Sequence, residues 1–295
     1  IDTDITQQKN YEKQILAQND QITSSIKYAL KIQKSILPSE EEIQPIFDNF
    51  IIYKPKDIVS GDFYWISNVF RMERKRLRRV PNPEEGLKVD DITFFAVVDC
   101  TGHGVPGAFM SLIGSRLLGE IVNEMRIVKP KDILYHLDFK LSRVLKRSQN
   151  RNYDGMVVSI CKFEKVKEEG IEKMNVTFAG AKQHLTYHLH KTNEFIKLRG
   201  SARQIGFVVN PALEFYEKEF TLQSGDTIFM YTDGFKDLNN PERKSFGYSH
   251  ITRILKNNIS KPINEIGKTL ENEMEKWLAT GKQRDDVTFV GLRIK

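Results

Sequence analysis

Aspartates at the ends of predicted strands are the residues of this sequence best suited to chemistry. Four segments combine a hydrophobic stretch with an Asp and a small or flexible neighbour: 59–62 (VSGD), 97–100 (VVDC), 231–234 (YTDG) and 284–287 (RDDV). A single Asp at a strand end is usually only a turn residue. Four of them on adjacent strands can converge on one spot, where their negative charges repel unless a cation lies among them. Carboxylate oxygens suit Mg²⁺ or Mn²⁺ rather than Zn²⁺.

Two such ions would give the site a reaction to perform. With two ions about 4 Å apart, a bridging water becomes hydroxide at neutral pH and attacks a phosphorus atom in line. The sequence contains no cluster of histidines and cysteines spaced as zinc ligands. We therefore expect phosphoryl chemistry where Asp62, Asp99, Asp233 and the pair Asp285–Asp286 meet.

The segment 99–108 (DCTGHGVPGA) is the most specific pattern in the chain. Its glycines allow a tight turn after a strand, and a helix is expected to open at Ala108, where exposed amides could face an anion. A nucleotide-binding phosphate loop would end in Gly-Lys-Ser or Gly-Lys-Thr. That ending is absent here, which argues against a Walker-type site.

These segments together resemble the SpoIIE-type branch of the protein phosphatase 2C-like (PPM) superfamily. Segment 99–108 is similar to the branch motif Asp-x-x-Gly-His-Gly-x-x-Ala. The other matching segments follow in order: 54–64 (KPKDIVSGDFY), 203–206 (RQIG), 231–237 (YTDGFKD), 246–247 (FG) and 283–288 (QRDDVT). The resemblance covers about residues 46–295. Ser60, Trp65 and a long basic insertion after Arg71 depart from the usual pattern, but none of them removes a proposed ligand.

The resemblance implies a fold and a metal site. The fold class is α+β, with two antiparallel β-sheets sandwiched between helices (αββα) and an N-terminal helical linker in front. Asp99 would bridge two Mn²⁺ or Mg²⁺ ions, and the carbonyl of Cys100 would hold one of them. The remaining ligands would be Asp62, directly or through water, with Asp233, Asp285 and Asp286. Asp285 matches the superfamily's usual ligand better than Asp286 does.

The implied activity is metal-dependent removal of phosphate from a phosphoserine or phosphothreonine protein. In this family such substrates belong to bacterial partner-switching signalling, where the partner is an anti-sigma-factor antagonist. One alternative is a pseudophosphatase that uses the fold as a signalling or docking module. Another is a hydrolase of a small phosphorylated metabolite, which would share the metal site.

Neither a general acid nor a phosphate-binding cation is fixed by the sequence. His103 lies two residues later than the histidine that follows the metal Asp in larger phosphatase 2C enzymes, and glycines flank it. A turn role for His103 is therefore favoured over general acid catalysis. Lys54 and Lys56 are candidates for binding phosphate, and a solvated surface position is an equally good interpretation.

The elements expected to position these residues are short strands interrupted by blocks of helix. Strands are predicted over 50–53, 62–69, 92–99, 156–163, 174–179, 185–190, 195–198, 215–222, 227–232 and 287–294. Apolar stripes predict helices over 133–145 and 263–278, and a third over 108–124. Successive hairpins with separate helical blocks favour antiparallel layers over a parallel doubly wound sheet.

The first 40 residues form a predicted linker, and residues 46–295 form the phosphatase domain. Residues 1–37 contain no Gly or Pro, and Ile15, Ile22, Ala29 and Ile36 recur every seven residues. This pattern predicts a coiled-coil homodimer, the alternative being a single amphipathic helix lying on the domain. The chain begins at Ile1, and we expect an upstream sensor domain in a longer protein.

Composition sets the broad class of protein. The 295 residues are 40% hydrophobic and 28% charged, as in globular domains, and the two cysteines form no zinc or disulfide pattern, as expected in the reducing cytoplasm. No membrane span is expected. The net charge of +6 comes largely from the basic run 71–79, which lacks interleaved aromatic residues. A nucleic-acid partner is therefore not expected.

Overall fold

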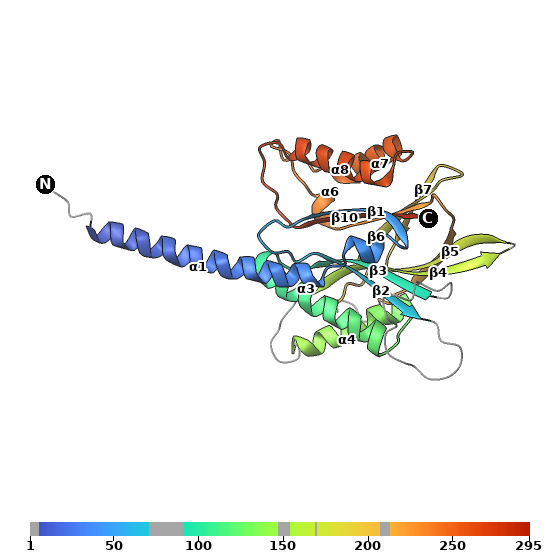
Figure 1. Ribbon diagram of the computed structural model, residues 1–295, viewed down its shortest axis with the longest axis horizontal. Helices are drawn as coiled ribbons and strands as arrows, with labels where there is room; N and C mark the ends of the chain where they lie inside the picture. Colours follow the sequence, from blue (N-terminus) through green and yellow to red (C-terminus); the bar gives the residue numbers. More distant parts are fainter. Residues whose placement is uncertain (1–5, 71–90, 147–153, 169, 207–212) are drawn as a thin grey trace.

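The computed structural model describes residues 6–70, 91–146, 154–168, 170–206 and 213–295 (Figure 1). The basic insertion around residues 71–80 lies outside the described residues. The chain forms a four-layer sandwich from which one long helix projects.

Two five-stranded antiparallel sheets form the centre of the sandwich. Sheet A has the order β1-β10-β9-β6-β7, and sheet B has the order β2-β3-β4-β5-β8. Sheet A consists of β1 (Phe47–Lys54), β10 (Val287–Ile294), β9 (Thr227–Tyr231), β6 (His184–Leu189) and β7 (Glu194–Arg199). Sheet B consists of β2 (Phe63–Phe70), β3 (Asp91–Cys100), β4 (Met156–Glu168), β5 (Ile171–Ala181) and β8 (Glu217–Leu222). The predicted fold class is confirmed.

Helices cover the outer face of each sheet (Figure 1). The outer face of sheet B packs against α3 (Gly104–Gly119), the π-helical turn η1 (Glu120–Glu124) and α4 (Pro130–Val144). The outer face of sheet A packs against α7 (Gly247–Asn258) and α8 (Ile263–Leu278). Short helices α2 (Glu40–Ile43) and α6 (Asp233–Lys236) complete the domain. The sequence did not predict α7, and α3 begins four residues before the predicted start.

Alternation of side chains along the strands divides the interior into three apolar layers. In β3, Phe94, Ala96 and Val98 face the helices over sheet B, whereas Phe95 and Val97 face sheet A. Side chains of successive strand residues point to opposite faces, so a strand that is apolar at every position must be covered on both sides. The uninterrupted apolar run of β3 therefore reflects its place inside the sandwich.

Helix α1 (Thr6–Ile36) meets the rest of the described chain through its C-terminal part (Figure 1). Ile15 and Ile22 are 56% and 57% exposed, whereas Gln33 is 1% exposed. The half of α1 that carries the first heptad positions is therefore available for a partner, and the other half packs against α3.

Helix α3 continues into η1 to give 21 residues, Gly104–Glu124, that are long and apolar enough to cross a membrane. Half of its most apolar window is buried inside the domain. A core helix of a globular domain has the same length and composition. The packing of α3 against β2, β3 and α4 accounts for its apolar side chains.

Both cysteines are free and buried. Cys100 is the last residue of β3, and Cys161 lies in β4 between the two sheets. Burial raises the pKa of both thiols above the ordinary value.

Candidate metal centre

The aspartates of the four sequence segments meet at one edge of the sandwich. In sheet B, Phe63 pairs with Val98, so Asp62 and Asp99 occupy the next pair of positions. In sheet A, Tyr231 of β9 pairs with Phe289 of β10, which places Asp233 after the end of β9 and near the start of β10. Asp285 and Asp286 immediately precede β10. Strand ends of both sheets therefore present carboxylates to the same region.

The carboxylates at this edge interact electrostatically with one another. Burial raises the pKa of Asp99 well above its usual range, and the charges of Asp62, Asp233, Asp285 and Asp286 raise it further. Burial likewise raises the pKa of Asp62, which is 2% exposed. Burial also raises the pKa of Asp286, and the partial removal of water around the carboxylate of the more exposed Asp233 raises its pKa. A cluster of mutually repelling carboxylates is a site that a cation would stabilise.

Asp62 is held by a hydrogen-bonded threonine from the opposite sheet. The Thr232 hydroxyl donates to Oδ2 of Asp62 at 2.7 Å, and the same hydroxyl oxygen accepts the backbone N–H of Thr288 at 3.0 Å. The backbone N–H of Asp62 donates to Oγ of Ser60 at 3.0 Å. Together these bonds fix the position of the Asp62 carboxylate before any ligand binds.

Asp286 connects the loop before β2 to the start of β10. Its Oδ1 accepts the backbone N–H of Lys56 at 2.8 Å, and its Oδ2 accepts that of Gly61 at 2.7 Å. Asp285 and Asp233 are exposed, whereas Asp286 is 3% exposed. Asp286 is thus occupied with backbone contacts that bring the loop of Asp62 to sheet A.

Two glycines allow the segments to pack this closely. A Cβ atom on Gly61 would lie 2.4 Å from the carbonyl oxygen of Gly102 and 3.3 Å from that of Cys100. A Cβ atom on Gly234 would lie 1.9 Å from the carbonyl oxygen of Asp286. Any larger residue at either position would push the segments apart. Gly61 also places the Cys100 carbonyl beside the loop that carries Asp62.

The donor set fits a hard divalent cation. It consists of carboxylate oxygens with a backbone carbonyl nearby, which are the ligands that Mg²⁺ and Mn²⁺ prefer. In the described part of the chain, no three His, Cys, Asp or Glu side chains already lie close enough together to hold an ion. The carboxylates repel one another in this arrangement, and a bound cation would offset that repulsion.

His103, Lys56 and Lys54 each contact a specific partner in the structure. His103 Nδ1 lies 2.7 Å from Asp57 Oδ2, and Lys56 Nζ lies 2.7 Å from His103 Nε2. Lys54 instead forms ion pairs with Glu271 and Glu275 of α8, at 2.9 and 2.7 Å. His103 also occupies the N-cap position of α3. Lys56 and His103 thus lie together at the start of α3, and Lys54 is directed towards α8.

Sequence reasoning did not single out Thr232, Tyr53 or Lys236. The Tyr53 hydroxyl donates to the backbone carbonyl of Asp62 at 3.1 Å. Lys236, one helical turn after Asp233, opposes the rise in the pKa of Asp233 that burial causes. Thr232 belongs to the Thr-Asp-Gly pattern. Its hydrogen bond to Asp62, however, joins the two sheets, and the spacing of nearby residues in the sequence does not predict it.

Comparisons with known proteins agree with this architecture. A family model described as stage II sporulation protein E (SpoIIE) matches residues 90–295. The SiaA-PP2C domain of Pseudomonas aeruginosa is 25% identical with a TM-score of 0.72, over 95% of this chain and 99% of that chain. A search of curated protein sequences found no match.

Two further solved structures share the fold at lower identity. The PP2C phosphatase domain of SpoIIE from Bacillus subtilis, solved with a fragment of its regulatory domain, is 21% identical with a TM-score of 0.60, over 84% of this chain and 63% of that one. The RsbU and RsbW domains of Rv1364c from Mycobacterium tuberculosis are 19% identical with a TM-score of 0.55, over 85% and 61%.

The sandwich and its acidic edge define the class of PP2C-like phosphatase domains. The family match covers more than half of the chain, and this chain belongs to the SpoIIE family.

Proposed function

We propose that this chain is a protein phosphatase that removes phosphate from phosphoserine or phosphothreonine with the help of two Mn²⁺ or Mg²⁺ ions. The observation that carries the proposal is the convergence of Asp62, Asp99, Asp233 and Asp285 in a domain of the SpoIIE family. When bound, the ions would supply an activated water as the nucleophile.

Each carboxylate has its own part in the proposed site. Asp99 would take the central position in this site, and the charges of all the other carboxylates of the cluster raise its pKa. Asp62 would reach the ions from the sheet B side, already oriented by Thr232. The exposed Asp233 and Asp285 would close the site from the sheet A side, and the Cys100 carbonyl would add a neutral oxygen. Asp286 would act chiefly by holding the loop of Asp62, with direct ligation as a second role.

The proposed substrate is a phosphoprotein of a partner-switching system, such as an anti-sigma-factor antagonist. The proposed location is the cytoplasm, and no nucleic acid takes part. We further propose that residues 1–40 form a signalling linker which pairs two copies through α1, and that residues 46–295 form the phosphatase unit. An upstream sensor would act through that linker.

Hydrolysis of an aryl phosphate tests the proposed chemistry. Wild type, Asp99→Asn and Asp233→Asn are compared in Mn²⁺ with and without a chelator, and Asp48→Asn serves as an exposed control at the other end of β1. We expect turnover by wild type and Asp48→Asn only, and only with metal. Turnover that survives the chelator or both substitutions would contradict the mechanism. A folded wild type without turnover on aryl phosphate or phosphopeptides would indicate a pseudophosphatase.

A further inference from the structure

A cleft of about 760 Å³ lies at the same edge of the sandwich as the proposed metal centre, and its lining carries an excess of positive charge. Its lining includes Lys182, His184, Arg199, Glu214 and Tyr216. Of the described residues in this lining, Glu214 is the one acidic side chain. The sequence patterns assigned none of these residues a role.

Strand pairing places the cleft on the same edge of the sandwich as the aspartates. In sheet A, Thr186 pairs with Phe229, so His184 falls opposite Tyr231, two residues before Asp233. His184 pairs in turn with Arg199 of β7. In sheet B, Asp99 pairs with Val157, and Lys182 forms a bridge with the adjacent Val158.

The distance between the cleft and the centre follows from this pairing. Neighbouring strands lie about 4.8 Å apart, so two strand spacings amount to about 10 Å. Arg199 is two strands from β9, which leads to Asp233, and Lys182 is two strands from β3, which carries Asp99. An extended peptide advances about 3.3 Å per residue, so about three residues span this distance.

Backbone hydrogen bonds give the cleft a rigid floor. The N–H of Lys182 donates to the carbonyl of Ser201 at 2.8 Å, and the N–H of Ser201 donates to that of Gly180 at 2.7 Å. The Tyr216 hydroxyl donates to the carbonyl of Gly200 at 2.7 Å, which holds an aromatic wall in place. A preformed site of this kind loses little conformational entropy when a ligand binds.

The charges around the cleft are not neutralised by their contacts. Lys182 Nζ donates to the neutral Oε1 of Gln204 at 3.1 Å, and Lys197 Nζ lies 3.6 Å from the ring centroid of Tyr248. Arg199 is exposed. Burial lowers the pKa of His184, and the positive charges of Lys197, Arg199 and Lys236 lower it further. Lys236, which also lowers the pKa of Asp233, is by contrast paired with Asp237.

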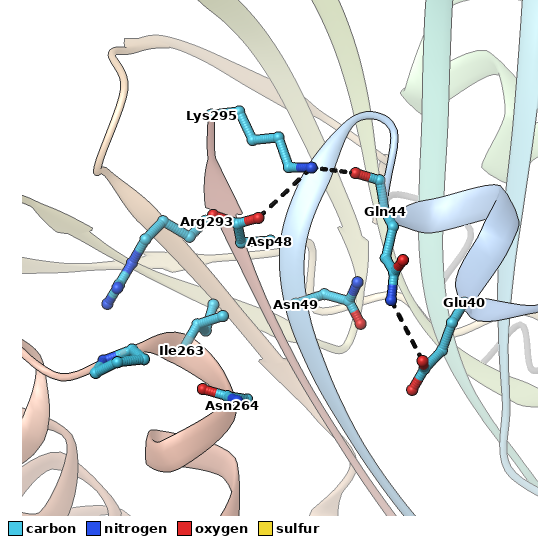
Figure 2. Close-up of a pocket in the computed structure, with 9 residues that line it drawn as sticks. Glu40, Gln44, Asp48, Asn49, Ile263, Asn264, Arg293 and Lys295 are labelled. Carbon is cyan, nitrogen blue, oxygen red and sulfur yellow. Dashed lines mark hydrogen bonds and ion pairs between the residues drawn. The ribbon is translucent and has the colours of Figure 1, made fainter.

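A second cleft, at the opposite end of sheet A, differs in that its lining holds as many acidic as basic side chains, Glu40 and Asp48 against Arg293 and Lys295 (Figure 2). There Lys295 bonds with Asp48 and the Gln44 carbonyl, while Gln44 bonds with Glu40. The Arg293 guanidinium donates to Thr227 Oγ1 and to the carbonyls of Lys261 and Ile259. The charges of this second cleft balance, whereas in the cleft at the metal edge Lys182 and Arg199 face the single acidic side chain of Glu214.

We propose that the cleft formed by Lys182, His184 and Arg199 is a docking site for acidic residues of the phosphoprotein substrate. The acidic side chains would lie about three positions from the phosphorylated Ser or Thr, since that is the span between the cleft and the aspartates. This inference rests on the proposed phosphatase function and adds a rule for substrate choice. Complementary charge at such a site sets specificity and speeds association.

Three synthetic phosphoserine peptides test the docking site. One has three Glu residues centred three positions before the phosphoserine, one has them after it, and one has Gln at all these positions. The first measurement is the ratio of kcat/KM for each acidic peptide over the Gln peptide. The second is peptide binding by fluorescence anisotropy without metal, which needs no turnover.

The variant Lys182→Glu/Arg199→Glu is compared with Lys256→Glu/Lys268→Glu, which reverses two exposed charges on α7 and α8. We expect wild type and the control to prefer an acidic peptide. In the cleft variant, the ratio of kcat/KM for the acidic peptide over the Gln peptide should fall about tenfold. Lys182→Gln/Arg199→Gln, a milder change, should lose part of it. Binding should also weaken in about 1 M salt, where the Debye length is about 3 Å.

The proposal fails if wild type shows no preference, or if the cleft variant keeps it. It also fails if anionic lipid vesicles, and not acidic peptides, bind in a way that depends on Lys182 and Arg199. If aryl phosphate is not hydrolysed while acidic peptides bind the cleft, the docking site stands and the phosphatase proposal fails.

Discussion

The side-chain amide of Gln33 in α1 forms two hydrogen bonds with the backbone of Ser60, two residues before Asp62. Gln33 Oε1 accepts the Ser60 N–H at 3.0 Å, and Nε2 donates to the Ser60 carbonyl oxygen at 2.6 Å. The same Nε2 donates to the Ser111 hydroxyl of α3 at 2.9 Å. One buried side chain of the linker thus joins the loop of Asp62 to the helix that follows Asp99.

Replacing Gln33 tests whether the linker controls the metal centre. Gln33→Ala leaves buried backbone groups of Ser60 without partners, which costs about 1–3 kcal/mol. We expect a lower Tm and a higher Mn²⁺ concentration for half-maximal aryl phosphatase activity. Gln14→Ala, at an exposed position of the same helix, is the control. If Gln33→Ala and Gln14→Ala show the same Mn²⁺ dependence, α1 does not act on the metal centre through Gln33.

Two deletions separate pairing of copies from coupling to the site. Removing residues 1–22 deletes the exposed Ile15 and Ile22 but keeps Gln33. Removing residues 1–37 deletes the two isoleucines and also the hydrogen bonds of Gln33 with Ser60. We expect the shorter deletion to abolish dimers, seen by light scattering. We expect the longer one also to change specific activity and metal dependence. A domain that stays dimeric and equally active after the longer deletion would rule out the proposed linker role.

Thr232 is expected to position Asp62. Thr232→Val removes the hydroxyl that donates to Asp62 while keeping the shape of the side chain. Loss of a residue that orients a metal ligand typically lowers metal affinity or activity about 10- to 100-fold. Thr232→Ser keeps the hydroxyl and should retain most of the Mn²⁺ affinity, measured by calorimetry. Equal affinities for the Val and Ser variants would show that the hydrogen bond is dispensable.

Charge repulsion predicts opposite effects of Asp99→Asn on stability and on metal binding. Because burial and neighbouring carboxylates raise the pKa of Asp99, its charged form opposes folding. Relief of about 1 kcal/mol would raise the Tm of the metal-free protein by about 2–4 °C. Mn²⁺ should stabilise wild type but not the variant.

The pH dependence of this effect has a definite sign. A carboxyl with a raised pKa contributes stability at low pH, and that contribution is lost as the pH rises through the folded-state pKa. The Tm advantage of Asp99→Asn should therefore be largest near neutral pH and shrink on acidification. An advantage that grows as the pH falls would contradict the assignment of repulsion to Asp99.

The buried ion pair between Asp138 and Arg203 should matter more for stability than exposed pairs do. Arg203 Nη2 lies 2.5 Å from Asp138 Oδ2, and Oδ1 of Asp138 accepts the N–H of Gly206. Asp138→Asn leaves a buried guanidinium without its counter-charge, which costs about 3–5 kcal/mol. Glu242→Gln, in an exposed pair with Lys244, should change the unfolding free energy by less than about 1 kcal/mol. Similar urea midpoints for the two variants would contradict this ranking.

Sequence periodicity predicted all the strands of the two sheets. Each strand lies between polar turns, and its apolar residues occupy either alternate or successive positions. Helix α7 was missed because its apolar positions, Ile251, Ile254 and Leu255, are few and follow a loop rich in polar residues. The motifs drew attention to aspartates that the structure brings to one edge of the sandwich. Contacts such as Thr232–Asp62 and Gln33–Ser60 join residues 170 and 27 positions apart, and no local pattern encodes them.

The two buried thiols offer a reporter that the protein already contains. A thiol reagent reaches Cys100 only when the acidic edge opens, and it reaches Cys161 only when the sheets separate. Local openings of a folded domain differ widely in free energy. The ratio of the two alkylation rates would therefore distinguish local opening at the acidic edge from global unfolding, without any added label.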